Sequence, residues 1–183
     1  MPQPRFTHRL ARPGDLTALT ALMDAAIAQL LRGFLTDAQI AASRAIMGLD
    51  SQLIEDGTYY VVLAKTGEIA GCGGWSRRAT LYGGDHSPGR DAAALDPASD
   101  AARVRAMYTA PAFARQGVGR LILEICEGAA AAEGFQRAEL VATAAGEPLY
   151  MACGYEVIER FDDDRGGAPV PLARMGKALR GAR

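Results

Sequence analysis

Apolar and polar positions change their period several times along the chain, and each change predicts a new element. A short alternation over residues 6–10 predicts a strand, and the Pro-Gly-Asp turn after it places Asp15 at the start of a helix. Apolar residues then recur at spacings of three and four up to about Arg32, which predicts an amphipathic helix. A capping box at residues 36–39 predicts a second helix that Gly57 ends.

The pattern then becomes that of strands joined by turns. Residues 58–64 are rich in β-branched and aromatic side chains, and a hairpin signal leads to a returning strand at 69–76. Residues 79–100 have little periodicity and predict a long functional or mobile loop. Further strands are expected at 103–109, 138–143, 155–161 and 170–175, with helices at 117–133 and 147–153. This order predicts one mixed sheet with helices packed on it, in the α/β class.

Composition narrows the class of protein. The chain has 183 residues, enough for one domain, and its 20 basic and 21 acidic side chains give a net charge of −1. We therefore expect no nucleic-acid or membrane partner, since both need a basic excess. Three scattered cysteines and two histidines predict reduced thiols and no metal site. With no secretory signal and no apolar span, we expect a cytoplasmic protein.

The segment from 106 to 125 carries the most specific chemistry. A strand ends at Thr109, and Arg-Gln-Gly-Val-Gly-Arg, residues 115–120, opens a helix. Free N–H groups in the first turn of that helix, beside Arg115 and Arg120, predict a phosphate site if the two glycines admit a ligand to the backbone. The glycines are equally compatible with a tight strand-to-helix turn. The spacing matches neither a P-loop nor a dinucleotide fingerprint.

These residues resemble the GNAT superfamily of acyl-CoA-dependent N-acetyltransferases. Residues 114–119, A-R-Q-G-V-G, are similar to the family's Q/R-x-x-G-x-G/A signature, with Ala114 in its first position. The segment LYMACGY at 149–155 is similar to a later family motif, and RLARPGDL near the start is similar to its usual first strand and turn. The resemblance implies one domain over residues 1–183, with its core at about 6–176. It also implies a mostly antiparallel sheet of about seven strands, helices on both faces and a splayed cofactor cleft between strands 103–109 and 138–143.

The resemblance further implies acetyl-CoA as cosubstrate, no metal, and direct transfer of the acetyl group to an amine. It implies that the backbone of Met107, Tyr108 and Thr109 lines the pantetheine arm, with the N–H near Met107 facing the thioester carbonyl. Tyr150 would protonate the departing thiolate, as a phenol of comparable basicity can. The pyrophosphate would be held by the helix start, which comprises Arg115, Gln116, Gly117, Val118, Gly119 and Arg120.

The general base stays open. Some family members place a carboxylate at the position of Arg103, so that group is absent here. The candidates by residue type are Glu68, Asp85, His86 and Asp100, and a chain of water molecules is an alternative to all four. No residue is assigned.

The resemblance implies a small-molecule or peptide amine of unidentified class as acceptor, and a homodimer is one option for the assembly. Aromatic residues fit either an acceptor wall or ordinary core; they are Phe34, Tyr59, Tyr60, Trp75 and Tyr82. Arg77 and Arg78 fit either an acceptor carboxylate or a solvated strand end. Three other functions compete: a non-catalytic acyl-CoA-binding module, transfer of another acyl group, and a scaffold that does not bind coenzyme A.

Overall fold

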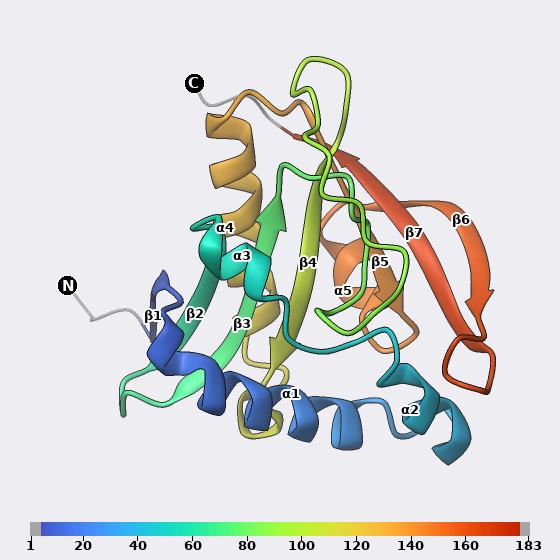
Figure 1. Cartoon of the computed structure of the whole chain (residues 1–183). Helices are drawn as coiled ribbons and strands as arrows, with labels where there is room; N and C mark the ends of the chain where they lie inside the picture. The colour runs from blue at the N-terminus through green and yellow to red at the C-terminus, as the bar shows by residue number, and fades with distance from the viewer. Residues whose placement is uncertain (1–4, 180–183) are drawn as a thin grey trace.

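The computed structural model describes residues 5–179, so the ends of the predicted domain, 1–4 and 180–183, lie outside it. Its helices and strands follow the predicted order, with one extra helix (Figure 1). The strands are β1 (Phe6–Leu10), β2 (Tyr59–Ala64), β3 (Ile69–Ser76), β4 (Ala102–Thr109), β5 (Arg137–Thr143), β6 (Glu156–Asp163) and β7 (Val170–Ala178). The helices are α1 (Leu16–Leu30), α2 (Asp37–Ser43), α3 (Ser51–Glu55), α4 (Val118–Ala132) and α5 (Glu147–Ala152).

The seven strands form one sheet in the order β1-β2-β3-β4-β5-β7-β6, and every neighbouring pair is antiparallel except β4 with β5. The parallel pair is in register only at Ala102 with Ala138 and Arg103 with Glu139. Beyond Arg103 the two strands separate, as Figure 1 shows. The predicted seven-stranded, mostly antiparallel sheet with a splayed centre is therefore confirmed.

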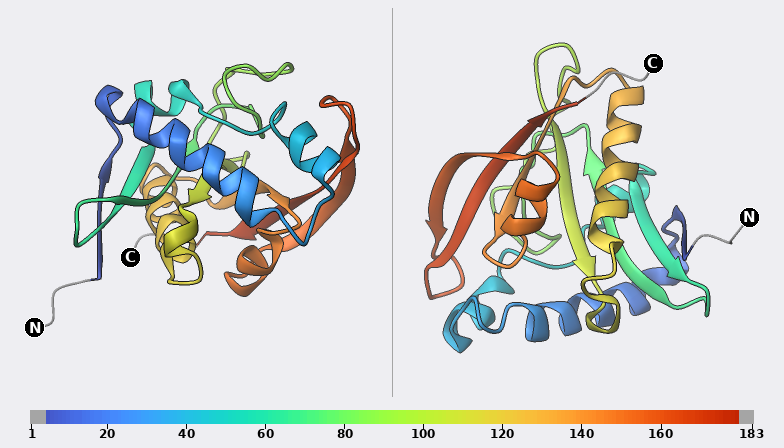
Figure 2. Two further views of the ribbon diagram at one scale, coloured as in Figure 1. Left: turned by 90° about the horizontal axis from the view of Figure 1, so that it is seen from below. Right: turned by 180° about the vertical axis from the view of Figure 1, so that it is seen from behind.

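Helices cover both faces of the sheet. Buried residues of α1, such as Leu19 and Ile27, pack on one face with Tyr59 and Val61 of β2. On the opposite face, Ile122 of α4 packs in a second core (Figure 2). Apolar stripes on the two long helices and alternation in the strands thus produce two cores separated by the sheet.

The predicted helix over 36–57 is wrong in its length. Thr36 and Gln39 form the expected capping box, at 3.2 and 3.0 Å, but the chain forms two short helices, α2 and α3. Between them Gly48 has φ +144°, outside helical geometry, and its N–H donates to the Tyr108 hydroxyl at 2.8 Å. A contact with β4, distant in sequence, replaces the helical hydrogen bond at this position.

Asp15 stands at the N-cap position of α1, but its side chain does not cap that helix. Its carboxylate accepts from the Arg12 N–H at 2.8 Å and pairs with Arg9 at 2.7 and 2.9 Å. These bonds fix the turn between β1 and α1 instead.

Hydrogen bonds connect the long loop over 79–100 to other parts of the fold. Ser87 Oγ donates to the Ala45 carbonyl at 2.8 Å, and Tyr82 donates to Asp163 Oδ2 at 2.8 Å. Within the loop, Thr80 Oγ1 donates to the Asp91 carbonyl at 2.7 Å. The loop therefore forms a fixed wall on the α3 side of β4 (Figure 1).

Candidate active site

A cavity of about 470 Å³ lies at the opening between β4 and β5. Its walls come from α1, the ends of β4 and β5, the start of α4, and α5. Nine of the ten predicted site residues line it: Met107, Tyr108, Thr109, Arg115, Gly117, Val118, Gly119, Arg120 and Tyr150. A larger hollow, of about 940 Å³ between α4 and the outer strands, contains none of them. Segments far apart in the sequence thus meet in one space large enough for a small ligand.

Gln116 is the predicted site residue that does not line this cavity. Its Oε1 accepts from Arg5 Nη2 at 2.6 Å, and its Nε2 donates to the Ala112 carbonyl at 3.1 Å. The side chain is therefore engaged by the chain around it, on the side away from the cavity.

The end of the β4 backbone borders the cavity because β5 pairs with β4 only at Ala102 and Arg103, and on its other edge β4 has a bulge. Ala106 has φ +50°, and the pairing with β3 shifts between Cys72 and Gly74. Tyr59, fully buried, donates its hydroxyl hydrogen to the Ala106 carbonyl at 2.8 Å and holds the bulge in place. Since β5 has separated from β4 here, main-chain groups of β4 on that edge have no strand partner.

The start of α4 has the features of an anion-binding site. Its first helical hydrogen bond runs from the Leu121 N–H to the Gly117 carbonyl at 3.0 Å. The N–H groups of Val118, Gly119 and Arg120 therefore have no acceptor within the helix, and the positive end of the helix dipole lies beside them. Arg120 is exposed at the same place, as is Arg115. An anionic group such as a pyrophosphate fits this arrangement.

Glycine is needed at the two positions of this turn for different reasons, the backbone conformation at Gly117 and the packing of a neighbouring helix at Gly119. Gly117 has φ +89°, which favours glycine, and a Cβ there would meet nothing within 4 Å. A Cβ on Gly119 would lie 2.6 Å from Leu149 Cδ2. Gly119 thus allows α5 to pack against α4, which places Tyr150 close to the anion site.

Tyr150 directs its hydroxyl toward β4. Its oxygen lies 3.8 Å from Met107 Sδ, and its ring packs edge-on against Tyr155, with 6.0 Å between ring centres. Gly146 leaves room for the ring, since a Cβ there would lie 3.0 Å from Tyr150 Cε2. Burial raises the pKa of Tyr150, so the phenol stays protonated and available as a hydrogen-bond donor.

A second chamber of about 100 Å³ adjoins the first. The two share Met47, Met107, Tyr108, Thr143 and Tyr150. Its other walls are Leu81–Gly83 of the long loop, Arg105 of β4, and parts of β5 and β7. An acceptor bound in this inner chamber and a thioester bound in the outer cavity would meet beside Tyr150.

None of the four candidate bases lines either space; they are Glu68, Asp85, His86 and Asp100. Asp85 accepts from the Ser51 N–H at 3.0 and 3.1 Å, and His86 Nε2 contacts the Arg44 carbonyl at 2.6 Å. Glu68 and Asp100 accept hydrogen bonds within their own turns. Among residues 5–179, no carboxylate or imidazole side chain lines the two spaces.

The aromatic candidates divide between core and site. Trp75 packs against Phe135 in the core on the α4 side, with 5.9 Å between ring centres. Phe34 lines the outer cavity with 54% of its surface exposed, and Tyr82 lines the inner chamber. Tyr59 and Tyr60 line neither space, and neither do Arg77 and Arg78, which pair with Glu133 and Asp56.

Sequence reasoning missed two parts of these walls. The end of α1 lines the outer cavity through Ile27 and Leu30, as does Leu31 directly after it, although the apolar stripe indicated only core. The segment Ile46–Gly48 and Arg105 line the inner chamber, and no motif signals them.

Both Cys72 and Cys126 are buried, which raises the pKa of each thiol, in the case of Cys72 to about 12. Neither is a nucleophile.

Within the described chain, no three potential metal ligands converge on one point. No helix among residues 5–179 is both long and apolar enough to cross a bilayer.

The fold is a single splayed, mostly antiparallel sheet with helices on both faces, and comparison with known families identifies the family to which it belongs. The family model described as "Acetyltransferase (GNAT) domain" matches residues 55–157, more than half of the chain. This chain belongs to the GNAT acetyltransferase family and is an acyltransferase by that membership. No curated protein matches it.

Solved structures share the fold over almost the whole chain. A GCN5-related N-acetyltransferase from Rhodopseudomonas palustris is 18% identical, with a TM-score of 0.67 and coverage of 98% of this chain and 99% of that one. A phosphinothricin acetyltransferase from Sinorhizobium meliloti, in complex with AcCoA, is 20% identical, with a TM-score of 0.64 and coverage of 96% and 89%. N-acetylglutamate synthase from Neisseria gonorrhoeae, complexed with coenzyme A and N-acetyl-glutamate, is 14% identical, with a TM-score of 0.63 and coverage of 98% and 36%. At these identities the likeness concerns the fold.

Proposed function

We propose that this protein is an N-acetyltransferase that moves the acetyl group of acetyl-CoA directly to the nitrogen of a primary amine. The observation that carries the proposal is the outer cavity, which joins an anion site, the open edge of β4 and the Tyr150 hydroxyl in one space. Two solved neighbours were captured with coenzyme A or AcCoA, which supports the same cosubstrate here. The free thiols of all three cysteines fit the cytoplasmic location that we also propose.

The chain's own groups fit the parts of acetyl-CoA. The N–H groups of Val118, Gly119 and Arg120 would bind the pyrophosphate, with the Arg115 and Arg120 side chains adding charge. The backbone of Met107–Thr109, open toward β5, would run beside the pantetheine arm. Acetyl-CoA itself supplies an activated thioester carbon.

In the transfer step, the amine nitrogen forms a bond to the acetyl carbon and the carbon–sulfur bond breaks. An N–H near Met107 would stabilise the developing oxyanion, which can contribute about 3 kcal/mol. Tyr150 would donate its proton to the departing thiolate and recover one from solvent. The proton displaced from nitrogen would leave through water, since no carboxylate or imidazole among the described residues lines the site.

The amine must therefore attack in its neutral form. An amine of ordinary pKa is mostly charged at neutral pH, so we expect kcat/KM to rise with pH until the acceptor is deprotonated. Burial favours this, because transfer into a low-dielectric chamber disfavours the ammonium form.

Calorimetric titration with acetyl-CoA tests the cofactor site. Gly117→Glu and Gly117→Ala form a matched pair: both place a side chain at φ +89°, but only glutamate adds a carboxylate at the anion site. We expect saturable binding to wild type and to Gly117→Ala, and its loss in Gly117→Glu. If folded wild type does not bind acetyl-CoA, the proposal is wrong.

Release of free thiol with a library of amines tests the transfer itself. We expect turnover that needs both acetyl-CoA and an amine. Binding of acetyl-CoA without turnover on any amine would identify the non-catalytic acyl-CoA-binding module instead. Faster turnover with a longer acyl-CoA would change the donor and leave the amine chemistry intact.

A further inference from the structure

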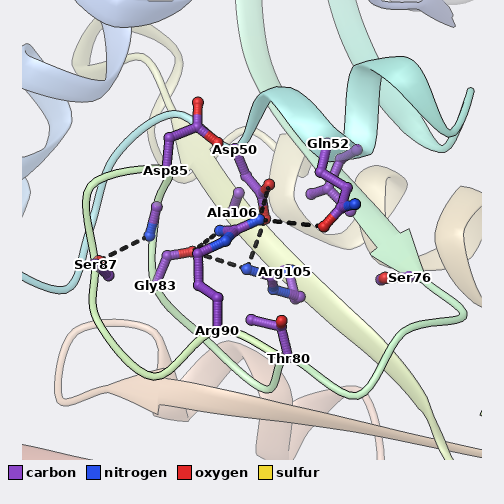
Figure 3. A network of polar contacts seen from close by, with 12 residues as sticks. Asp50, Gln52, Ser76, Thr80, Gly83, Asp85, Ser87, Arg90, Arg105 and Ala106 are labelled. Atoms are coloured by element: carbon purple, nitrogen blue, oxygen red, sulfur yellow. Dashed lines mark hydrogen bonds and ion pairs between the residues drawn. The ribbon is translucent and has the colours of Figure 1, made fainter. Parts of the chain in front are cut away.

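A buried ionic cluster lies at one end of the inner chamber. Arg105 of β4 is only 5% exposed, and its Nη2 lies 2.6 Å from Asp50 Oδ2 and 2.8 Å from the Gly83 carbonyl. Asp50 is fully buried, and its Oδ1 accepts from Arg90 Nη2 at 2.8 Å. Figure 3 shows Arg105 between the loop that carries Gly83 and the segment that carries Asp50. Three chain segments thus bring two guanidinium groups to one carboxylate.

The cluster carries a net positive charge, because two guanidinium groups share one buried carboxylate. Asp50 alone faces both Arg90 and Arg105. Asp85, the other nearby carboxylate, is exposed and accepts from the Ser51 N–H. Burial lowers the pKa of Arg105, because the charged form has lost water that one shared carboxylate does not replace. A second anionic group beside Arg105 would neutralise the remaining positive charge.

Arg105 also retains hydrogen-bonding capacity. Its Nε–H is buried and has no acceptor among residues 5–179. A buried donor without an acceptor costs free energy, so such groups in native proteins call for an explanation. Arg105 lines the inner chamber, and it is the one lining residue of that chamber with a formal charge at neutral pH. A ligand in this chamber would therefore meet both the charged Arg105 and Tyr150.

We propose that Arg105 is a specificity-determining residue that binds a carboxylate on the acceptor, so that the acceptors are small amino acids. The proposal rests on the acetyl-transfer function above and names its substrate class. Guanidinium groups bind carboxylates through short charge-assisted hydrogen bonds. A polyamine would instead bring a second ammonium group against Arg105 with no acidic side chain beside it.

The first test uses wild-type protein alone. Thiol release is measured with α-amino acids, from glycine and alanine to larger members, and with the carboxamide of each. Rates are expressed per neutral amine, so that different amine pKa values do not distort the comparison. We expect kcat/KM at least about tenfold higher for the acids than for the carboxamides, as loss of a charge-assisted hydrogen bond predicts. Equal or faster turnover of the carboxamides, or of diamines, would overturn the proposal for Arg105 and leave acetyl transfer standing.

Variants then locate the effect. Arg105→Gln should raise KM for the amino acid about 10- to 100-fold, while KM for its carboxamide and for acetyl-CoA stays within threefold. Arg78→Gln is the matched control, because Arg78 also forms a two-bond ion pair, with Asp56, but lines neither space. It should keep the wild-type preference. A preference that persists in folded Arg105→Gln would refute the assignment.

Arg105→Lys covers the case in which the glutamine variant does not fold. Lysine keeps a positive charge for Asp50 but loses the planar fork, so we expect a reduced, non-zero preference for acids. An undiminished preference in Arg105→Lys would contradict recognition by the guanidinium group. If wild type acetylates no amine at all, the proposed function fails, and the assignment of Arg105 fails with it.

Discussion

Removal of the Tyr150 hydroxyl distinguishes an effect on the chemical step, seen in kcat, from an effect on acetyl-CoA binding, seen in KM. In the structure this hydroxyl has Met107 Sδ as its polar contact, at 3.8 Å, and a thioether is a weak acceptor. Tyr150→Phe should therefore change the free energy of unfolding by less than about 1 kcal/mol. Loss of a general acid lowers the rate by about 10²- to 10⁴-fold, equivalent to about 2.7–5.4 kcal/mol of transition-state stabilisation. We expect a fall of that size in kcat, with KM for acetyl-CoA within about threefold of wild type.

The assay is steady-state thiol release with acetyl-CoA varied at saturating acceptor, together with thermal unfolding. Tyr155→Phe is the control, since Tyr155 packs against Tyr150 but lines neither space. That variant should keep kcat within about threefold. A normal kcat in folded Tyr150→Phe would refute the acid role. Equal losses in both variants would show that the effect is not specific to the Tyr150 hydroxyl.

Three further predictions concern stability. Gly128 is an exposed interior residue of α4 with nothing within 4 Å of a Cβ, so Gly128→Ala should stabilise the protein by about 1 kcal/mol and raise Tm by about 2–4 °C in calorimetry. Burial raises the pKa of the Cys72 thiol to about 12, so the folded state keeps a proton that the unfolded state loses. Cys72 alone therefore contributes stability that is full below about pH 9 and falls by about 1.4 kcal/mol per pH unit from about pH 9 to 12. Burial raises the pKa of Cys126 as well, so urea titrations should show a shallower but non-zero slope in Cys72→Ala. Gly119→Ala should be less favourable in the wild type, where Leu149 Cδ2 would lie 2.6 Å from the new Cβ, than in a Leu149→Ala background, and a double-mutant cycle should give a coupling of about 0.5–3 kcal/mol.

The sequence predicts those elements whose signals are local. Alternation and apolar stripes locate all seven strands and the long helices, since each element buries its own apolar face. The break between α2 and α3 is different. It depends on the bond from Gly48 to the Tyr108 hydroxyl, and these two residues are 60 positions apart. No periodicity near Gly48 carries that information.

In the candidate site, too, residues with local sequence signals could be predicted and residues that depend on distant contacts could not. The turn at 115–120 and Tyr150 each belong to a contiguous motif, so the resemblance to a family could place them at one site, and all of these residues except Gln116 line the outer cavity. Arg105 could not, because its significance comes from Asp50 and Arg90, which reach it from other segments. Gly119 was expected to admit a ligand to the backbone, and the structure adds that it makes room for Leu149.

The separation of β4 and β5 explains why an amine could react here without a nearby base. Because the two strands pair only at Ala102 and Arg103, both spaces open into the same gap, and Tyr150 borders each. An ammonium group entering the inner chamber loses water and finds no carboxylate among the described lining residues, so its pKa falls and the neutral amine is favoured. In the proposed role, Arg105 would bind the acceptor's carboxylate and hold the substrate without stabilising the ammonium form. In the proposed reaction, the same fold feature would therefore position the two substrates and favour the reactive form of the amine.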